Sequence, residues 1–185
     1  MRDLLAMLTD EQYSDLTIEA EYDGEPPVRF PVHACVLSRR SAVFCAALSH
    51  GTREAASRRI RLVDTPPLVL KALLHYLYSD DFAEVERVLR EAVEAGGRDA
   101  AAGAAAVPQA TAEQRMAQLQ ALLAVAHKYQ VGRLLCWSEQ QLCRLVRAES
   151  VCSLVELARV YDASELLQHC LRFMKAHQAQ VVARA

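Results

Sequence analysis

The order of apolar and polar positions changes along the chain from strand-like to helical. Residues 16–22 alternate between apolar and polar side chains, and Asp23-Gly24 follows as a turn signal. Residues 29–32 form a second short segment after Pro26-Pro27. Alternation with a period of two indicates half-buried strands, so we predict a hairpin with a lengthened loop. The arginine-rich residues 58–63 predict an exposed strand at a sheet edge, where charge discourages unwanted pairing.

Most of the remaining chain has the apolar spacing of amphipathic helices. This spacing predicts helices at residues 1–9, 41–48, 68–77, 82–95, 119–128, 133–145, 151–161 and 164–175. Tyr76 and Tyr78 fall on different sides of their helix, so we expect one ring to be exposed. Residues 96–113 are rich in alanine and glycine and hold few large apolar groups to offset the entropy of ordering. We predict a flexible insertion there.

Composition narrows the class of protein. The chain has 185 residues, of which 52% are hydrophobic and 24% charged, with a formal net charge of -2. This near-neutral balance argues against a nucleic-acid binder that neutralises phosphates, and no apolar run reaches the roughly 18 residues of a membrane span. The N-terminus, with Asp3 near its start, does not resemble a signal peptide. We therefore expect a cytoplasmic or nuclear protein with neither nucleic acid nor membrane as a partner.

A search for chemistry finds none of the common catalytic or nucleotide-binding motifs. The six cysteines (Cys35, Cys45, Cys136, Cys143, Cys152 and Cys170) lie within apolar patterns and lack metal-binding spacing. We predict that they are free thiols packed in the core. His33 and Cys35 form the closest pair, which we interpret as packing. No catalytic residue, metal site or cofactor is expected.

Two segments carry a more specific signal. Tyr13-Ser14-Asp15-Leu16-Thr17-Ile18 is followed by Phe30-Pro31-Val32-His33-Ala34-Cys35-Val36-Leu37-Ser38-Arg39-Arg40-Ser41-Ala42-Val43-Phe44. Together they resemble the signature of the BTB (POZ) family, with His-x-x-x-Leu and then Ser-x-x-Phe. Residues 60–62, 70–78 and 122–131 match later family elements in order, and residues 149–182 are similar to the helical extension called the 3-box or the start of a BACK domain.

The resemblance implies an α+β fold, in which a small mixed sheet is flanked by a helical cluster. It implies a BTB/POZ domain over residues 1–146, which contains the predicted insertion, and a helical-pair extension over residues 147–185. It also implies a protein-interaction module rather than an enzyme.

The first helix is expected to form an interface. Leu4, Met7 and Leu8 share one apolar face at the end of the chain, where a monomer has little core left to cover. The resemblance adds Tyr13 and Asp15 to the interface of a two-fold homodimer.

The resemblance further implies recruitment of the N-terminal domain of cullin-3, with this chain as a ubiquitin-ligase adaptor. The residues that match the family's contact positions are Leu48, Thr52, Glu54, Lys128 and Tyr129. Adaptors of this family carry a hydrophobic-x-Glu motif, whose apolar position is here the only weakly apolar Thr52. The alternative is a dimerisation scaffold with no ligase role, of transcriptional or channel type. For the adaptor role, the substrate is expected to bind a domain that this sequence does not contain.

One further departure concerns the aspartate of the first strand. Family members generally carry Lys or Arg directly after the histidine, where it pairs with this aspartate. Ala34 follows His33 here, so we expect Asp15 to lack that cation and to rely on water or backbone N–H groups.

Overall fold

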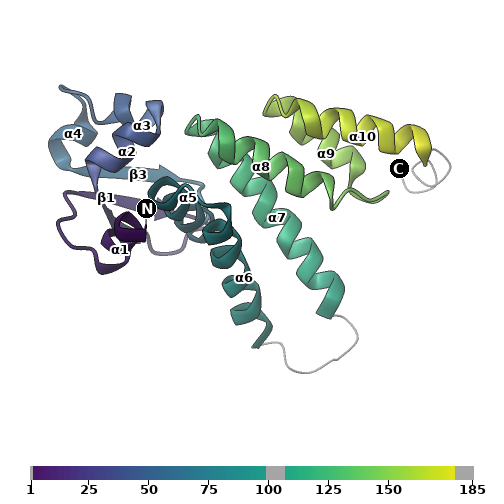
Figure 1. Cartoon of the computed structure of the whole chain (residues 1–185), viewed down its shortest axis with the longest axis horizontal. Helices are drawn as coiled ribbons and strands as arrows, with labels where there is room; N and C mark the ends of the chain where they lie inside the picture. The colour runs from purple at the N-terminus through teal and green to yellow at the C-terminus, as the bar shows by residue number, and fades with distance from the viewer. Residues whose placement is uncertain (1, 99–106, 178–185) are drawn as a thin grey trace.

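In the computed structural model, residues 2–98 and 107–177 are described, and they form one small sheet surrounded and followed by helices (Figure 1). The strands are β1 (Leu16–Glu21), β2 (Val28–Val32) and β3 (Arg59–Val63). The helices are α1 (Arg2–Asp10), α2 (Ala34–Arg40), α3 (Ala42–Ala47), α4 (Arg53–Ser57), α5 (Pro67–Ser79), α6 (Phe82–Arg98), α7 (Val107–Lys128), α8 (Gly132–Cys143), α9 (Val151–Val160) and α10 (Ser164–Ala176).

The sheet is mixed and has the order β2-β1-β3. The central strand β1 pairs antiparallel with β2 and parallel with β3, so that Ile18 lies opposite both Phe30 and Ile60. On β3, Ile60 and Leu62 are buried, while the alternate residues are exposed. The predicted hairpin and edge strand are confirmed, and so is the α+β fold with its C-terminal helical extension.

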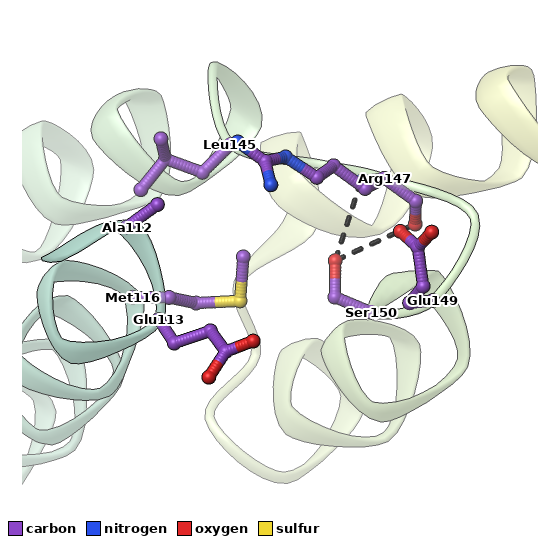
Figure 2. Close-up of a pocket in the computed structure, with 7 residues that line it drawn as sticks. All are labelled: Ala112, Glu113, Met116, Leu145, Arg147, Glu149 and Ser150. Carbon is purple, nitrogen blue, oxygen red and sulfur yellow. Dashed lines mark hydrogen bonds between the residues drawn. The ribbon is translucent and has the colours of Figure 1, made fainter. Parts of the chain in front are cut away.

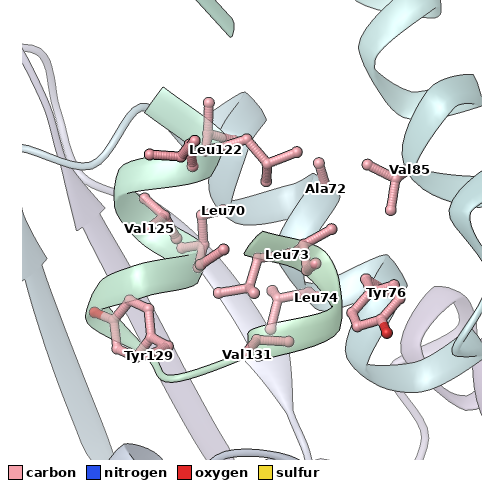
Figure 3. Close-up of a cluster of buried hydrophobic side chains, with 14 of the residues drawn as sticks. Leu70, Ala72, Leu73, Leu74, Tyr76, Val85, Leu122, Val125, Tyr129 and Val131 are labelled. Carbon is pink, nitrogen blue, oxygen red and sulfur yellow. The ribbon is translucent and has the colours of Figure 1, made fainter. Parts of the chain in front are cut away.

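Helix α5 forms the centre of the core (Figure 3). Nine of its residues, from Val69 to Tyr78 with the exception of Lys71, are buried. The expectation that either Tyr76 or Tyr78 is exposed is wrong, because neighbouring elements cover both sides of the helix. The ring of Tyr76 stacks on Phe82 with 5.2 Å between centroids, and Tyr78 contacts His33, the residue that precedes α2.

Helices α6 and α7 extend into the predicted insertion from both ends. The structure has α6 as far as Arg98 and α7 from Val107. An ion pair between Glu86 and Arg115 joins the two helices, and Met116 packs against the core. These contacts hold the N-terminal half of α7 in place, which the small side chains of the preceding alanine-rich segment could not do by themselves. The rest of the predicted insertion, residues 99–106, lies outside the described residues.

Helices α9 and α10 form an antiparallel pair that packs on α8, away from the sheet (Figure 1). Val151, Leu154 and Ala158 of α9 are buried, together with Leu166 and Cys170 of α10. Among residues 2–98 and 107–177, no helix is long and apolar enough to cross a membrane.

Candidate protein-interaction surfaces

The residues predicted for dimerisation lie on α1 and just after it. We call this region the α1 surface (Leu4, Met7, Leu8, Tyr13 and Asp15). Helix α1 packs against α5 of its own chain, and Leu8 is half-buried against the core. The expectation that a monomer has little core for this helix to cover is therefore wrong in part. Leu4 does remain 38% exposed, so the outward side of the stripe is still available to a partner.

An apolar hollow of about 240 Å³ opens beside Leu4. It is lined by Leu4, Cys35, Val36, Arg39, Arg40, Leu77 and Tyr78. These residues come from α1, α2 and α5, so the hollow lies where the three helices meet and their side chains leave a gap.

Tyr13 and Asp15 follow α1 in an irregular segment. Tyr13 is 86% exposed and has a positive φ of 61°, a conformation that is uncommon for a bulky residue. The expectation that Asp15 relies on backbone N–H groups agrees with the structure, but the expectation that it has no cation is wrong, because its Oδ2 lies 3.4 Å from Nη1 of Arg58. Its Oδ1 accepts the backbone N–H of Ala34 at 2.8 Å. The segment 34–58 thus satisfies Asp15 twice without a basic residue after His33.

His33 is a structural residue at the start of α2. Its Nε2 lies 2.7 Å from the carbonyl of Gln12, and its Nδ1 lies 2.9 Å from the hydroxyl of Tyr78. The Tyr78 hydroxyl also accepts the backbone N–H of His33 at 2.8 Å. Burial raises the pKa of Tyr78 to about 12, so the phenol keeps its proton for the imidazole. The interpretation of His33 as a satisfied packing residue agrees with this network.

The predicted cullin contacts lie on α3, α4 and the turn after α7, which we call the α3–α4 surface (Leu48, Thr52, Glu54, Lys128 and Tyr129). Thr52 has an internal role there that the sequence analysis missed. Its hydroxyl accepts the N–H of Ala55 at 3.1 Å and so caps α4. The same hydroxyl lies 2.7 Å from the carbonyl of Ala47, to which it donates. Thr52 therefore fixes the start of α4 relative to the end of α3.

The other members of the α3–α4 surface differ in exposure. Leu48 and Glu54 are half-buried, and Lys128 is exposed. Tyr129 is only 3% exposed, because its ring stacks on Phe44 with 4.5 Å between centroids. Burial raises its pKa to about 12. The Tyr129 side chain is thus covered by its own chain and is not accessible to a partner. Its role is to hold the turn after α7 against α3.

The turn and α3 are joined by one more contact. The hydroxyl of Ser41 donates to the carbonyl of Tyr129 at 2.7 Å. This bond and the Phe44–Tyr129 stack join the turn after α7 to the start of α3, although Ser41 and Tyr129 are 88 residues apart in sequence.

Comparison with known proteins identifies the family. The BTB/POZ domain model matches residues 4–96, which is half of the chain. The chain belongs to the BTB/POZ domain family. BTB/POZ domains are typically non-catalytic protein-interaction modules.

Several curated proteins are similar to this BTB chain over almost its whole length. BTB/POZ and MATH domain-containing protein 4 of Arabidopsis thaliana is 34% identical over 167 residues, which are 90% of this chain and 32% of that protein. BTB/POZ domain-containing protein 9 of Rattus norvegicus is 27% identical over 182 residues, or 96% of this chain and 24% of that protein. The human protein of the same name is 26% identical over 181 residues, with the same coverage. The chain thus spans a third or less of the length of these relatives.

A buried carboxylate on α8 links this helix to α10. Glu139 of α8 is 5% exposed, and its Oε2 accepts the backbone N–H groups of Glu165 at 3.0 Å and Leu166 at 3.2 Å. These N–H groups belong to the first turn of α10, where no residue of α10 itself caps the helix. A residue of α8 therefore supplies the N-terminal cap of α10.

The packing between α7 and the segment that connects α8 to α9 is less complete. A hollow of about 280 Å³ lies between the N-terminal part of α7 and the connection from α8 to α9 (Figure 2). Met116 and Ser150 lie on opposite sides of it, and the Ser150 hydroxyl accepts the backbone N–H of Arg147 at 3.2 Å. The α9–α10 pair is thus attached through the contacts between α8 and α10, whereas a hollow separates the connection before α9 from α7.

The cysteines do not follow the expectation that they pack in the core. All six thiols are free, but Cys35, Cys45, Cys136 and Cys152 are exposed, while Cys170 is buried. Each exposed cysteine lies on the side of its helix that faces solvent. Apolar neighbours in the sequence do not show which side of the helix a residue occupies. Among residues 2–98 and 107–177, no group of three or more His, Cys, Asp or Glu side chains could hold a metal ion.

Proposed function

We propose that this BTB chain forms a two-fold homodimer and recruits a cullin-3 ubiquitin ligase as its substrate adaptor. The chain itself would do no chemistry, and a domain outside the described residues would bind the substrate. Neither nucleic acid nor membrane is part of the proposal. Six free thiols fit a reducing compartment such as the cytoplasm or nucleus.

The observation that carries the proposal is the direct attachment of the helical pair to the BTB part. The Glu139 cap and the packing of α10 on α8 continue the domain into α9–α10 without a linker. Resemblance assigns this arrangement to adaptors, whereas BTB domains that repress transcription are typically followed by linkers and zinc fingers. The similarity to a plant protein named for BTB/POZ and MATH domains supports an adaptor that carries a separate recognition domain.

The α1 surface is the proposed dimer interface. A second copy of α1 would cover Leu4 and the hollow formed with α2 and α5, and Tyr13 is presented to the same partner by its unusual backbone. Leu4→Asp would place a charge in this apolar contact. We expect the variant to be monomeric by light scattering. Leu171→Asp on α10 is the matched control, because Leu171 is 42% exposed, close to the 38% of Leu4.

A dimer that persists in Leu4→Asp, or that dissociates equally in Leu171→Asp, would contradict this assignment.

The α3–α4 surface is the proposed cullin site. Leu48 would supply the apolar contact, while Glu54 and Lys128 would supply polar ones. Glu54→Lys should weaken binding of the cullin-3 N-terminal domain by about tenfold or more, because it reverses a charge at a half-buried contact. Isothermal titration calorimetry measures this, with Glu25→Lys in the exposed β1–β2 loop as a control of equal charge change.

A second candidate function, a dimerisation scaffold with no ligase role, is favoured by Thr52. The position that family adaptors give to an apolar contact holds here a hydroxyl that is engaged with Ala47 and Ala55. Replacing it with Met would add apolar area, at about 0.8 kcal/mol per buried CH₂, but would remove a cap of about 1 kcal/mol. If the wild-type chain shows no heat of binding with cullin-3, the scaffold function replaces the adaptor function.

A further inference from the structure

The side of the sheet that faces away from α5 carries an unusual concentration of arginine. Glu19 on the central strand lies opposite Arg29 on β2 and Arg61 on β3. Arg59 lies one row away, opposite Thr17. We call this the arginine face (Thr17, Glu19, Arg29, Arg59 and Arg61). It is distinct from the α1 surface and the α3–α4 surface.

The carboxylate of Glu19 lies beneath three guanidinium groups. Its side chain is 7% exposed, and its Oε1 lies 3.1 Å from Nε of Arg29 and 4.0 Å from Nη1 of Arg59. Its Oε2 lies 4.0 Å from Nε of Arg61. One buried carboxylate therefore holds three arginines together at the centre of an open sheet.

The arginines themselves remain accessible. The side chains of Arg29, Arg59 and Arg61 are 66%, 65% and 68% exposed. Each guanidinium has five N–H donors, and the partners nearby are two carboxylates, Glu19 and Glu21, of which Glu21 lies 3.1 Å from Arg61. Three positive charges against two negative ones leave the face positive, and about two thirds of each arginine side chain is open to solvent.

We propose that the arginine face binds an acidic peptide segment of a partner protein, with Arg59 and Arg61 contacting its carboxylates. The planar guanidinium matches a carboxylate with two parallel hydrogen bonds, and arginine clusters are a recurrent means of recognising acidic motifs. The exposed Val63, at 54%, lies at the end of the same strand and offers an apolar contact beside the charges. Glu19 acts as a positioning residue that keeps the guanidinium groups in register.

A nucleic acid fits this face less well. Unstacked bases bind aromatic platforms between basic residues, and the side chains on the outward rows of the strands are Thr17, Glu19, Glu21, Arg29, Pro31, Arg59, Arg61 and Val63. No aromatic ring is among them. An extended acidic segment needs only the forked donors that are present.

The test is the binding of a fluorescein-labelled peptide of about ten glutamates to the full chain, followed by fluorescence anisotropy at low and high salt. We expect saturable binding that weakens as salt screens the charges. Arg59→Glu/Arg61→Glu should raise the Kd by about tenfold or more, since two charge-assisted contacts are reversed. Arg144→Glu/Arg172→Glu makes the same change of net charge at two exposed residues, one directly after α8 and one on α10, and its Kd should stay within about twofold of the wild type.

Three outcomes would overturn the proposal: no saturable binding by the wild type, equal loss in both double variants, or tighter binding of a single-stranded oligonucleotide than of the peptide. If thermal melting shows that the charge-reversed variant is unfolded, Arg59→Gln/Arg61→Gln replaces it, with an expected loss of about threefold or more. An unchanged Kd in that variant contradicts the proposal. None of these outcomes bears on cullin-3, since the probe addresses a different surface.

Discussion

Helix α5 and the pair α9–α10 show two ways in which helices of one chain are stabilised. Nine residues of α5 are buried, so its neighbours cover it nearly all round. Helix α10 buries two residues, Leu166 and Cys170, and exposes Leu171 on its outer side. Helix α5 is held by apolar packing on nearly all sides, whereas α10 is held by its contacts with α8 and α9 and by a cap supplied by Glu139. The core should therefore fold as a unit on which the extension depends.

The largest effect is expected from a truncation in the centre of the core. Leu73 on α5 is fully buried, and Leu73→Ala should lower the free energy of unfolding by about 3 kcal/mol through lost transfer energy and a new cavity. Urea unfolding measures this, with circular dichroism as the signal. Leu171→Ala, at an exposed position, should change it by about 0.5 kcal/mol or less. Similar losses in the two variants would remove the contrast between the regions.

A smaller and more local effect is expected from the cap. Glu139→Ala leaves the N–H groups of Glu165 and Leu166 without their acceptor and should destabilise the extension by about 1–2 kcal/mol. Hydrogen exchange should become faster in α9 and α10 but not in α5. Gln140→Ala, at the exposed neighbouring position, serves as the control. Faster exchange throughout α5 would show that the extension and the core unfold together.

The smallest expected effect is a dependence of stability on pH that arises from a buried histidine of the core. Burial lowers the pKa of His75 on α5 below its ordinary value of 6.5, against the opposing contribution of Glu84. The unfolded chain therefore binds a proton more readily than the folded one, and stability is complete above about pH 6.5 and falls as the pH decreases below it. Thermal melting between pH 7.5 and about 5 should show this fall. His75→Gln should reduce the slope, while the exposed His50→Gln should leave it unchanged.

The sequence predicts the sheet better than it predicts exposure. Alternation over residues 16–22 locates β1, because a strand with one buried face repeats every two residues. The burial of Tyr76 and the exposure of Cys136 depend instead on which elements pack nearby, and this information is absent from local periodicity. Helix α7 was predicted to begin at residue 119, because alanine-rich sequence gives no sign of the Glu86–Arg115 pair that holds its earlier turns.

The apolar stripe of the α1 surface was predicted from its helical spacing and the α3–α4 surface through resemblance, whereas the details of both follow from contacts distant in sequence. Arg58 as the partner of Asp15 and Glu139 as the cap of α10 could not be inferred from spacing, since 43 and 26 residues separate the members. The cap at Thr52 could have been recognised, because a threonine after Gly51 and before Arg53-Glu54-Ala55 is a common helix start. The roles of Leu48, Glu54 and Lys128 in binding remain predictions.

The most direct measurement of the adaptor function is the mass of the complex formed with the cullin-3 N-terminal domain. Size-exclusion chromatography with multi-angle light scattering should show an assembly of two chains and two cullin domains, since the α1 surface and the α3–α4 surface involve different elements. Leu4→Asp should reduce it to one of each, and Glu54→Lys should leave a dimer of this chain alone. Separate elution of the wild-type chain and the cullin domain would contradict the account.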